Sequence, residues 1–221
     1  MTTRRAFAMA LGLLLVACGG GAEPTTTTVA APAPSTPEAV FAELVEALGS
    51  ADLESVAELT DPAQVPLLAI AEGLDARSVA ELTSTDRTAV STNFWQGFAE
   101  QLRASIGVDL ADLRVDSVDR VEVGDTEFAT VELVYGRDAS ARRMVLRNSD
   151  AGWVVDLIAS FPSPMLGQIP NAAQLIRSIG DPSLTDSLRG YEPSVRFLLE
   201  DPGLDPLLYQ AGTAALVASA R

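Results

Sequence analysis

Residues 121–135, VEVGDTEFATVELVY, decide the fold class of this chain. Apolar side chains occupy every second position in the second half of this stretch, at Ala129, Val131, Leu133 and Tyr135. This period of two predicts a strand with one buried face. Gly124-Asp125 predicts a turn before the strand, and residues 113–123 alternate more loosely as its partner.

Two further strands are predicted after this hairpin. Residues 140–147 place Met144 and Leu146 on one side, and residues 153–158 form the last strand. Gly and Asp/Asn-rich turns separate the segments, at 136–138 and 148–152. Because the connections are short, the sequence predicts an antiparallel sheet of about four strands.

The residues before the sheet have helical periodicity. Thr36 and Pro37 are suited to begin a helix that Gly49 ends. Asp52 and Asp61-Pro62 are suited to begin two shorter helices. The longest helix is expected to begin at Thr85 or Asp86, with apolar residues at every fourth position and Trp95 beside them. Those apolar residues are Val90, Phe94, Phe98, Leu102 and Ile106.

Residues 161–221 contain seven prolines, which predict short helices as an extension packed on the domain. The candidates are residues 172–179, 193–199 and 207–220. The last helix is apolar over much of its surface but too short to span a bilayer. Helices followed by a strand meander give an α+β fold over residues 37–160, with amino-terminal helices packed on a curved antiparallel sheet.

Residues 37–158 resemble the nuclear-transport-factor-2-like superfamily in the order of their elements. The similarity also rests on Asp150-Ala151-Gly152-Trp153-Val154-Val155-Asp156, a turn that leads into the last strand with a Gly and a Trp. The resemblance implies a cone-like fold, which occurs in many small bacterial envelope lipoproteins. It also implies a cavity at the wide end, where related isomerases and cyclases use Asp, His or Tyr.

The amino terminus is typical of exported, lipid-anchored proteins. Arg4 and Arg5 precede an apolar run that is too short for a resident transmembrane helix and has the length of a signal peptide. Leu15-Val16-Ala17-Cys18 resembles the lipobox of bacterial lipoproteins, which implies cleavage after residue 17 and a diacylglyceryl group on Cys18. An ordinary secretory signal is the alternative, and export through the general or the twin-arginine route stays open.

A Pro- and Thr-rich segment, residues 18–36, follows the predicted cleavage site. It has no apolar periodicity and should stay extended or disordered as a tether. Two acyl chains on Cys18 are enough for stable attachment. The sequence therefore predicts a domain held at the extracytoplasmic face of the cell membrane.

Composition excludes several functions. The chain has 15 Arg, no Lys and 30 acidic residues, giving a formal charge of -15, so it lacks the basic clusters that nucleic acids require. Its one Cys permits no internal disulfide, and the absence of His removes the commonest general base and metal ligand. We expect no cofactor, no metal and no nucleic-acid partner.

Two strand carboxylates are the candidate catalytic residues. Glu132 and Asp156 each lie between apolar or β-branched neighbours on one strand face, where burial would raise the pKa of a general base. The alternative is that both lie on solvent-exposed strand faces. The acidic residues between Asp109 and Glu127 do not match a calcium loop, and a solvated sheet edge is the interpretation that we favour.

Five aromatic residues are the predicted lining of a ligand pocket: Phe94, Trp95, Phe98, Tyr135 and Trp153. The alternative is that they belong to an ordinary core. The function that these patterns favour is a non-enzymatic binding domain for a small apolar ligand or an envelope protein. An isomerase- or cyclase-like enzyme using a strand carboxylate and an envelope assembly or scaffold protein are the alternatives.

Overall fold

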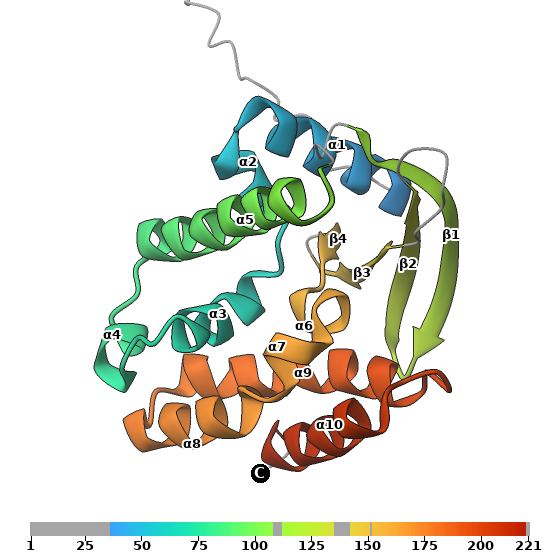
Figure 1. The fold of residues 1–221 in the computed structure, drawn as a ribbon. Helices are drawn as coiled ribbons and strands as arrows, with labels where there is room; N and C mark the ends of the chain where they lie inside the picture. The colour runs from blue at the N-terminus through green and yellow to red at the C-terminus, as the bar shows by residue number, and fades with distance from the viewer. Residues whose placement is uncertain (1–35, 108–111, 135–141, 151, 220–221) are drawn as a thin grey trace, which may run out of the picture. The chain divides into compact units, whose positions relative to one another are not determined.

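The computed structural model describes residues 36–107, 112–134, 142–150 and 152–219, which belong to one compact unit. Tyr135 and the predicted turn at 136–138 lie outside the described residues. Within them, ten α-helices, one 3-10 helix and a four-stranded antiparallel sheet are present (Figure 1). The predicted α+β class is therefore confirmed.

The sheet is a meander whose spatial order follows the chain, β1-β2-β3-β4. Its strands are β1 (Arg114–Val123), β2 (Thr126–Val134), β3 (Arg142–Ser149) and β4 (Gly152–Val155). Gly124 makes the turn between the first two strands with a φ of 62°, a conformation that glycine adopts without a Cβ clash. The predicted hairpins at both ends of the sheet are thus present.

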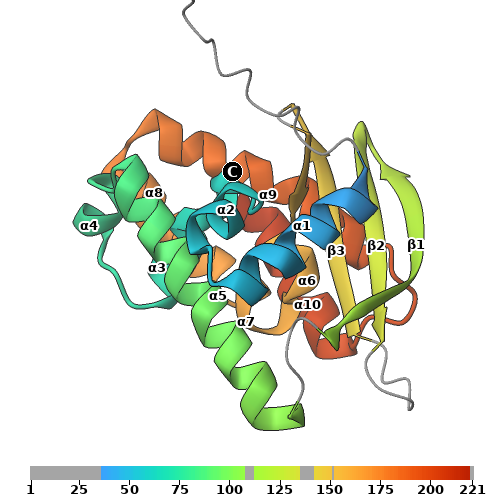
Figure 2. The same cartoon turned by 90° about the horizontal axis from the view of Figure 1, so that it is seen from above.

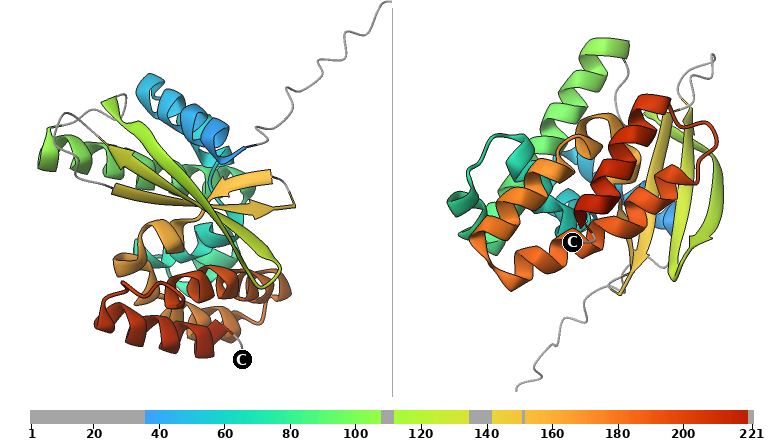
Figure 3. Two further views of the ribbon diagram at one scale, coloured as in Figure 1. Left: turned by 90° about the vertical axis from the view of Figure 1, so that its right-hand side faces the viewer. Right: turned by 90° about the horizontal axis from the view of Figure 1, so that it is seen from below.

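The two faces of the sheet are covered by opposite ends of the chain. Ala129, Val131 and Leu133 are buried on one face, here called the α1 face, because α1 (Pro37–Ser50) packs there. Phe128 points to the other face, the α9 face, where it stacks on Phe197 with ring centroids 4.7 Å apart. Figures 2 and 3 show this arrangement, with α1 on one side of the sheet and the carboxy-terminal helices on the other.

Side-chain caps set several of the predicted helix boundaries. The Thr36 hydroxyl accepts the Ala39 N–H at the start of α1, and Asp52 caps α2 (Leu53–Glu58), as expected. The helix α1 ends one residue later than the predicted end at Gly49. The helix continues to Ser50, and Ala51 then adopts a left-handed conformation with its N–H directed to the last carbonyls.

The central helices follow with small differences from the predicted boundaries. They are η1 (Pro62–Gln64), α3 (Val65–Ala71), α4 (Ala76–Ala80) and α5 (Ser84–Ile106). Asp61 caps the first of them, as expected. The long helix α5 begins before the predicted residues, because Thr83 and Asp86 form a reciprocal capping box.

The predicted strand at 153–158 is wrong beyond Val155. The chain turns at Asp156 into α6 (Leu157–Ser160), and the Asp156 carboxylate accepts the Ala159 N–H at 2.8 Å. The apolar residues that follow Asp156 are therefore buried as a helical turn rather than as alternate strand positions. α7 (Pro162–Leu166) comes directly after it.

Three longer helices complete the chain: α8 (Ile169–Ile179), α9 (Pro182–Leu199) and α10 (Pro206–Ser219). The predicted helix at 193–199 is too short, because α9 runs through Pro193. A proline there removes one backbone hydrogen bond, yet the apolar residues on both sides of it are buried together. Burial of these apolar residues therefore outweighs the tendency of Pro193 to end the helix.

Among the described residues, no helix is both long enough and apolar enough to cross a membrane.

Candidate functional site

A buried ion-pair cluster joins the sheet to α9. Arg147 of β3 is 8% exposed, and its guanidinium pairs with the Asp61 carboxylate through Nη2. Its Nη1 donates to the Gly190 carbonyl of α9 at 2.7 Å, and its Nε lies 3.9 Å from Asp156 Oδ2. Two buried carboxylates thus share one cation.

Asp156 has no exposed surface, and its carboxylate contacts Arg147, Ser194 and the Ala159 N–H. Ser194 of α9 donates its hydroxyl to Oδ2, while Oδ1 accepts the Ala159 N–H. Gln64 connects the same elements, because its Nε2 donates to Ser194 Oγ at 3.2 Å. Its Oε1 accepts the Leu157 N–H at 2.6 Å. The network ties η1, α6 and α9 into one unit.

A short parallel bridge explains why the two carboxylates meet. Thr60 pairs with Val155, through a 2.7 Å bond from Val155 N to the Leu59 carbonyl and a 3.1 Å bond from Asp61 N to the Val155 carbonyl. Asp61 and Asp156 are the residues that follow this pair, and each caps the helix after it. Both carboxylates therefore turn to the same side of the bridge.

Burial dominates the electrostatics of this cluster. It raises the pKa of Asp61 to about 6, the nearby Arg147 guanidinium opposes that rise, and the Asp156 charge adds to it. Burial also raises the pKa of Tyr191 above its usual range, and the Asp61 charge acts in the same direction. Among the described residues, Arg147 Nε, Tyr191 Oη and Ser91 Oγ are buried polar atoms with no hydrogen-bond partner.

The chemistry available to the cluster is limited by its enclosure. Asp156, Ser194 and Gln64 are completely buried, so no substrate reaches the Asp156 carboxylate without opening the packing between α6 and α9. The alternative that placed Asp156 on a solvent-exposed strand face is therefore wrong, because the residue is fully buried. Its position at a helix cap, and not on a strand, accounts for the difference.

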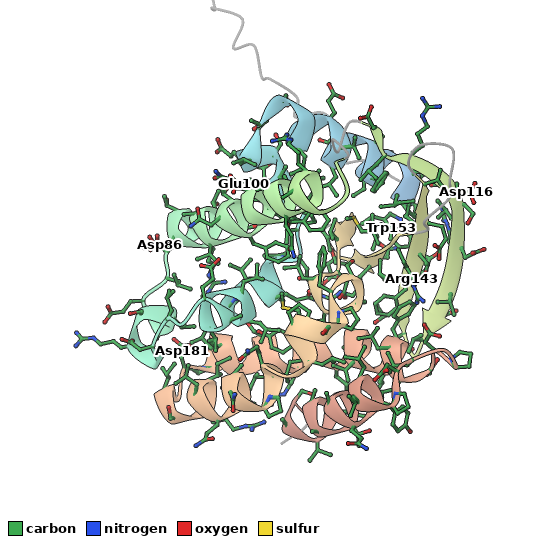
Figure 4. The ribbon with its side chains drawn as sticks, viewed as in Figure 1. Asp86, Glu100, Asp116, Arg143, Trp153 and Asp181 are labelled. Atoms are coloured by element: carbon green, nitrogen blue, oxygen red, sulfur yellow. The ribbon has the colours of Figure 1, made fainter. Side chains whose placement is uncertain are left out.

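Glu132, the other candidate catalytic residue, lies partly exposed in an open groove on the α9 face. The groove has a volume of about 360 Å³ and lies between the sheet and the end of α9. Arg143, labelled in Figure 4, lines it. The Arg143 guanidinium is ion-paired with Asp201 at 2.7 Å and lies 5.5 Å above the Phe197 ring. The lining consists of Asp119, Val121, Val123, Thr130, Glu132, Arg143, Phe197, Glu200, Asp201 and Pro202.

The predicted pocket aromatics that the structure describes lie in two places, three of them on α5 and Trp153 on β4. Phe94, Trp95 and Phe98 pack edge to face with Phe161, with the Phe98 and Phe161 centroids 5.2 Å apart. Trp95 is fully buried, and its Nε1 donates to the Thr60 hydroxyl at 2.8 Å. Trp95 belongs to the core, Phe94 and Phe98 are partly buried and pack against it, and none of the three lines the groove on the α9 face.

Trp153 lies on the α1 face of the sheet, under the Arg120 guanidinium at 5.5 Å, as the register of β3 and β4 requires. It is not among the rings that pack edge to face around Phe161, and Tyr135 falls outside the described residues. Among the described residues, no group of three or more potential ligand side chains is arranged to hold a metal ion.

Sequence reasoning missed Arg147, Gln64 and Ser194. Arg147 follows the buried Leu146 on β3, so strand alternation predicts that Arg147 lies on an exposed face. The sequence of one strand does not show that α9 covers this face. Gln64 and Ser194 carry no local signal, since their roles depend on contacts between segments far apart in the chain. The one local feature of this cluster that the sequence predicts is the helix cap at Asp61, which is confirmed.

The chain matches no protein-family model, and neither curated proteins nor solved structures give a match. The fold and the site define it in structural terms, as an α+β domain with a buried Arg–Asp cluster and an acidic groove on the α9 face of its sheet.

Proposed function

We propose that this protein is an extracytoplasmic lipoprotein whose domain binds a basic segment of a partner protein in the groove on the α9 face. Cys18, within the lipobox-like Leu15–Cys18, would carry the lipid after removal of residues 1–17. That cleavage leaves 13 Arg against 30 acidic residues, a charge of -17. The observation that carries the binding role is the groove, with its apolar floor and carboxylate rim.

The charge of the groove favours a basic ligand. Four carboxylates and one guanidinium line it, so its lining has a net charge of -3. The guanidinium, Arg143, is engaged with Asp201, which leaves the carboxylates of Asp119, Glu132 and Glu200 for a ligand. The attraction between these carboxylates and a bound cation would be strengthened by the low-dielectric walls on either side of the groove.

The apolar floor favours a ligand with apolar side chains as well as basic ones. Val121 is 45% exposed, and Phe197 and Pro202 extend the apolar surface toward α9. The groove is open to solvent along β1, whereas small-molecule sites commonly enclose most of their ligand. An extended peptide segment fits this geometry better than the small apolar ligand that the sequence also allowed.

Peptide binding tests the groove directly. The probe is a fluorescently labelled peptide of Arg and Leu, compared with the same peptide carrying Glu in place of Arg. The variant Asp119→Asn/Glu132→Gln/Glu200→Gln should weaken binding of the Arg peptide about tenfold or more, because it removes the charges that face it. Unchanged affinity would exclude the groove.

The matched control changes the net charge by the same amount elsewhere. Glu43→Gln/Glu46→Gln/Glu54→Gln neutralises three carboxylates on α1 and α2, away from the groove. It should leave the affinity nearly unchanged. An equal loss in both triple variants would show that only the overall charge matters and would contradict the proposal.

The anchor is tested separately, by fractionating cells that express wild type or Cys18→Ala. The variant should lose acylation and appear in a soluble fraction or stay uncleaved. Normal processing with wild-type membrane retention would refute the anchor and leave the groove proposal standing.

A further inference from the structure

One residue of the groove already occupies the surroundings that suit an arginine of a ligand. The Arg143 guanidinium on β3 donates from Nη1 to Asp201 Oδ2 at 2.7 Å, and it lies 5.5 Å from the centroid of the Phe197 ring. A carboxylate beside an aromatic ring attracts a guanidinium through a charge-assisted hydrogen bond and a cation–π contact. Arg143 therefore marks a guanidinium-binding place within the groove.

The two groups that hold Arg143 are kept in position by other parts of the chain. Asp201 comes shortly after α9, and its second carboxylate oxygen, Oδ1, accepts the Gly203 N–H at 2.9 Å. This bond, together with the bond from Arg143, holds the pKa of Asp201 below its ordinary value, so the carboxylate is charged at neutral pH. The Phe197 ring is buried and stacks on Phe128. Both groups should keep their places when Arg143 leaves.

Arg143 itself is weakly held. Its side chain is 38% exposed and that of Asp201 is 25% exposed, and ion pairs near solvent contribute little to stability. Glu132 is the residue directly opposite Arg143 in the pairing of β2 with β3. Side chains in such positions share a sheet face, with Cβ atoms about 5 Å apart. A displaced Arg143 guanidinium therefore has a second carboxylate within reach.

We propose that Asp201 and Phe197 form an arginine subsite of the groove, and that Arg143 fills this subsite until an arginine side chain of the partner displaces it toward Glu132. The inference rests on the proposed function, because it assigns one side chain of the basic ligand to one place in the groove. It adds Asp201 to the carboxylates that contact the ligand. It also makes Arg143 a competitor of the ligand.

The chemistry of the subsite favours arginine over lysine. A guanidinium is planar and weakly hydrated, so it can lie over the Phe197 ring while its N–H groups reach Asp201, as Arg143 does. An ammonium group is compact and strongly hydrated, and it has no flat face to place on the ring. Selection between these two cations therefore distinguishes a shaped subsite from the general attraction of an acidic groove.

Removal of Arg143 tests the exchange, with the labelled Arg–Leu peptide and a matching Lys–Leu peptide as probes. Arg143→Met should bind the Arg peptide about three- to tenfold more tightly than wild type, because the ligand no longer has to displace a like charge from its ion pair. The gain for the Lys peptide should be smaller. Arg143→Met/Asp201→Asn should lose most of the gain for the Arg peptide, since it lacks the carboxylate that the ligand takes over.

Arg77→Met is the matched control. Arg77 is ion-paired with Glu81 at 2.8 Å on the exposed surface of α4 and does not line the groove. Its loss changes the net charge by the same amount and breaks an ion pair of similar length, so the affinity for both peptides should stay nearly unchanged. Circular dichroism checks that each variant is folded, and Arg143→Gln replaces Arg143→Met if the methionine variant is not.

A gain with Arg143→Met that is larger for the Arg peptide and is lost with Asp201→Asn supports the proposal. A folded Arg143→Met protein that binds the Arg peptide no more tightly than wild type overturns it. So does an equal gain for the two peptides, or a gain that survives Asp201→Asn.

The triple variant Asp119→Asn/Glu132→Gln/Glu200→Gln separates this failure from a failure of the proposed function. If the triple variant loses affinity while Arg143→Met gains none, the groove proposal stands and only the arginine subsite is refuted. If the triple variant keeps wild-type affinity, the groove proposal is refuted, and the subsite with it.

Discussion

Lowering the pH from 7 to 4 should stabilise this protein through Asp61. The pKa of this carboxyl is about 6 in the folded chain, against an ordinary value of 3.8, because burial outweighs the attraction of Arg147. Between these two values the folded state binds a proton that the unfolded state has released. The contribution of Asp61 to stability is therefore fully present below about pH 4 and is lost as the pH rises through 6.

The size of the effect follows from that pKa difference. A shift of about 2 units corresponds to about 3 kcal/mol of unfolding free energy, at about 1.4 kcal/mol per unit. Exposed carboxyls whose pKa is lowered by hydrogen bonds, such as Asp75 and Asp86, act in the opposite direction and mainly below pH 4. The window from pH 4 to 7 therefore reports chiefly on groups whose pKa is raised.

Urea unfolding followed by tryptophan fluorescence at several pH values measures this dependence. Asp61→Asn should remove most of the gain on acidification, whatever its effect at pH 7, because the amide does not titrate. Glu72, whose pKa is also raised by burial, supplies the control Glu72→Gln, which leaves the Asp61 contribution in place. Reduced self-repulsion in this acidic chain affects all three proteins alike, so it cancels in the comparison.

An Asp61→Asn protein with the same pH slope as wild type would refute the assignment. A wild-type stability that does not rise between pH 7 and pH 4 would do the same, because it would mean that Arg147 fully compensates for the burial of the carboxylate.

Three further substitutions test the packing, each by chemical denaturation with a folded-state check by circular dichroism. Arg147→Met should cost about 3–5 kcal/mol, because it leaves two buried carboxylates without their cation, and a loss below 1 kcal/mol would contradict the ion-pair cluster. Phe197→Ala should cost about 3–5 kcal/mol by removing the ring stacked on Phe128, unless the contact between α9 and the sheet is much looser than the 4.7 Å spacing indicates. Trp95→Phe should cost about 1–3 kcal/mol, since it removes the 2.8 Å hydrogen bond to Thr60 and some core volume; a neutral result would show that the hydrogen bond contributes nothing.

The sequence predicts best where the determinants are local. Period-two alternation around Val131 and the caps at Thr36 and Asp52 depend on neighbouring residues, and the structure has the strands and helix starts that they predict. The end of β4 is different. Three apolar residues after Asp156 fit a strand as well as a helical turn, and contacts from Gln64 to the Leu157 and Ile158 N–H groups favour the turn.

The candidate site is harder to predict because its parts come from distant segments. The groove needs β1 and the end of α9, and the predicted break at Pro193 would have shortened the helix that brings Phe197 to the sheet. The aromatic residues at helical spacing were the candidates that the sequence offered, but they lie on α5, in or against the core. Spacing alone does not separate a core ring from a ring that lines a pocket.

Both notable features of this domain depend on the position of α9. Its middle is fixed by the buried cluster, through Gly190 and Ser194, while Phe197 and the residues after it form one wall of the groove. A carboxyl with a pKa near 6 thus lies in the network that places the groove wall. Protonation of Asp61 weakens its attraction for Arg147, but it also removes the repulsion between Asp61 and Asp156. Because these two effects oppose each other, α9 should keep its contacts with the cluster as the pH falls. The groove is then expected to keep its shape as the pH falls, because the network that holds α9 stays in place.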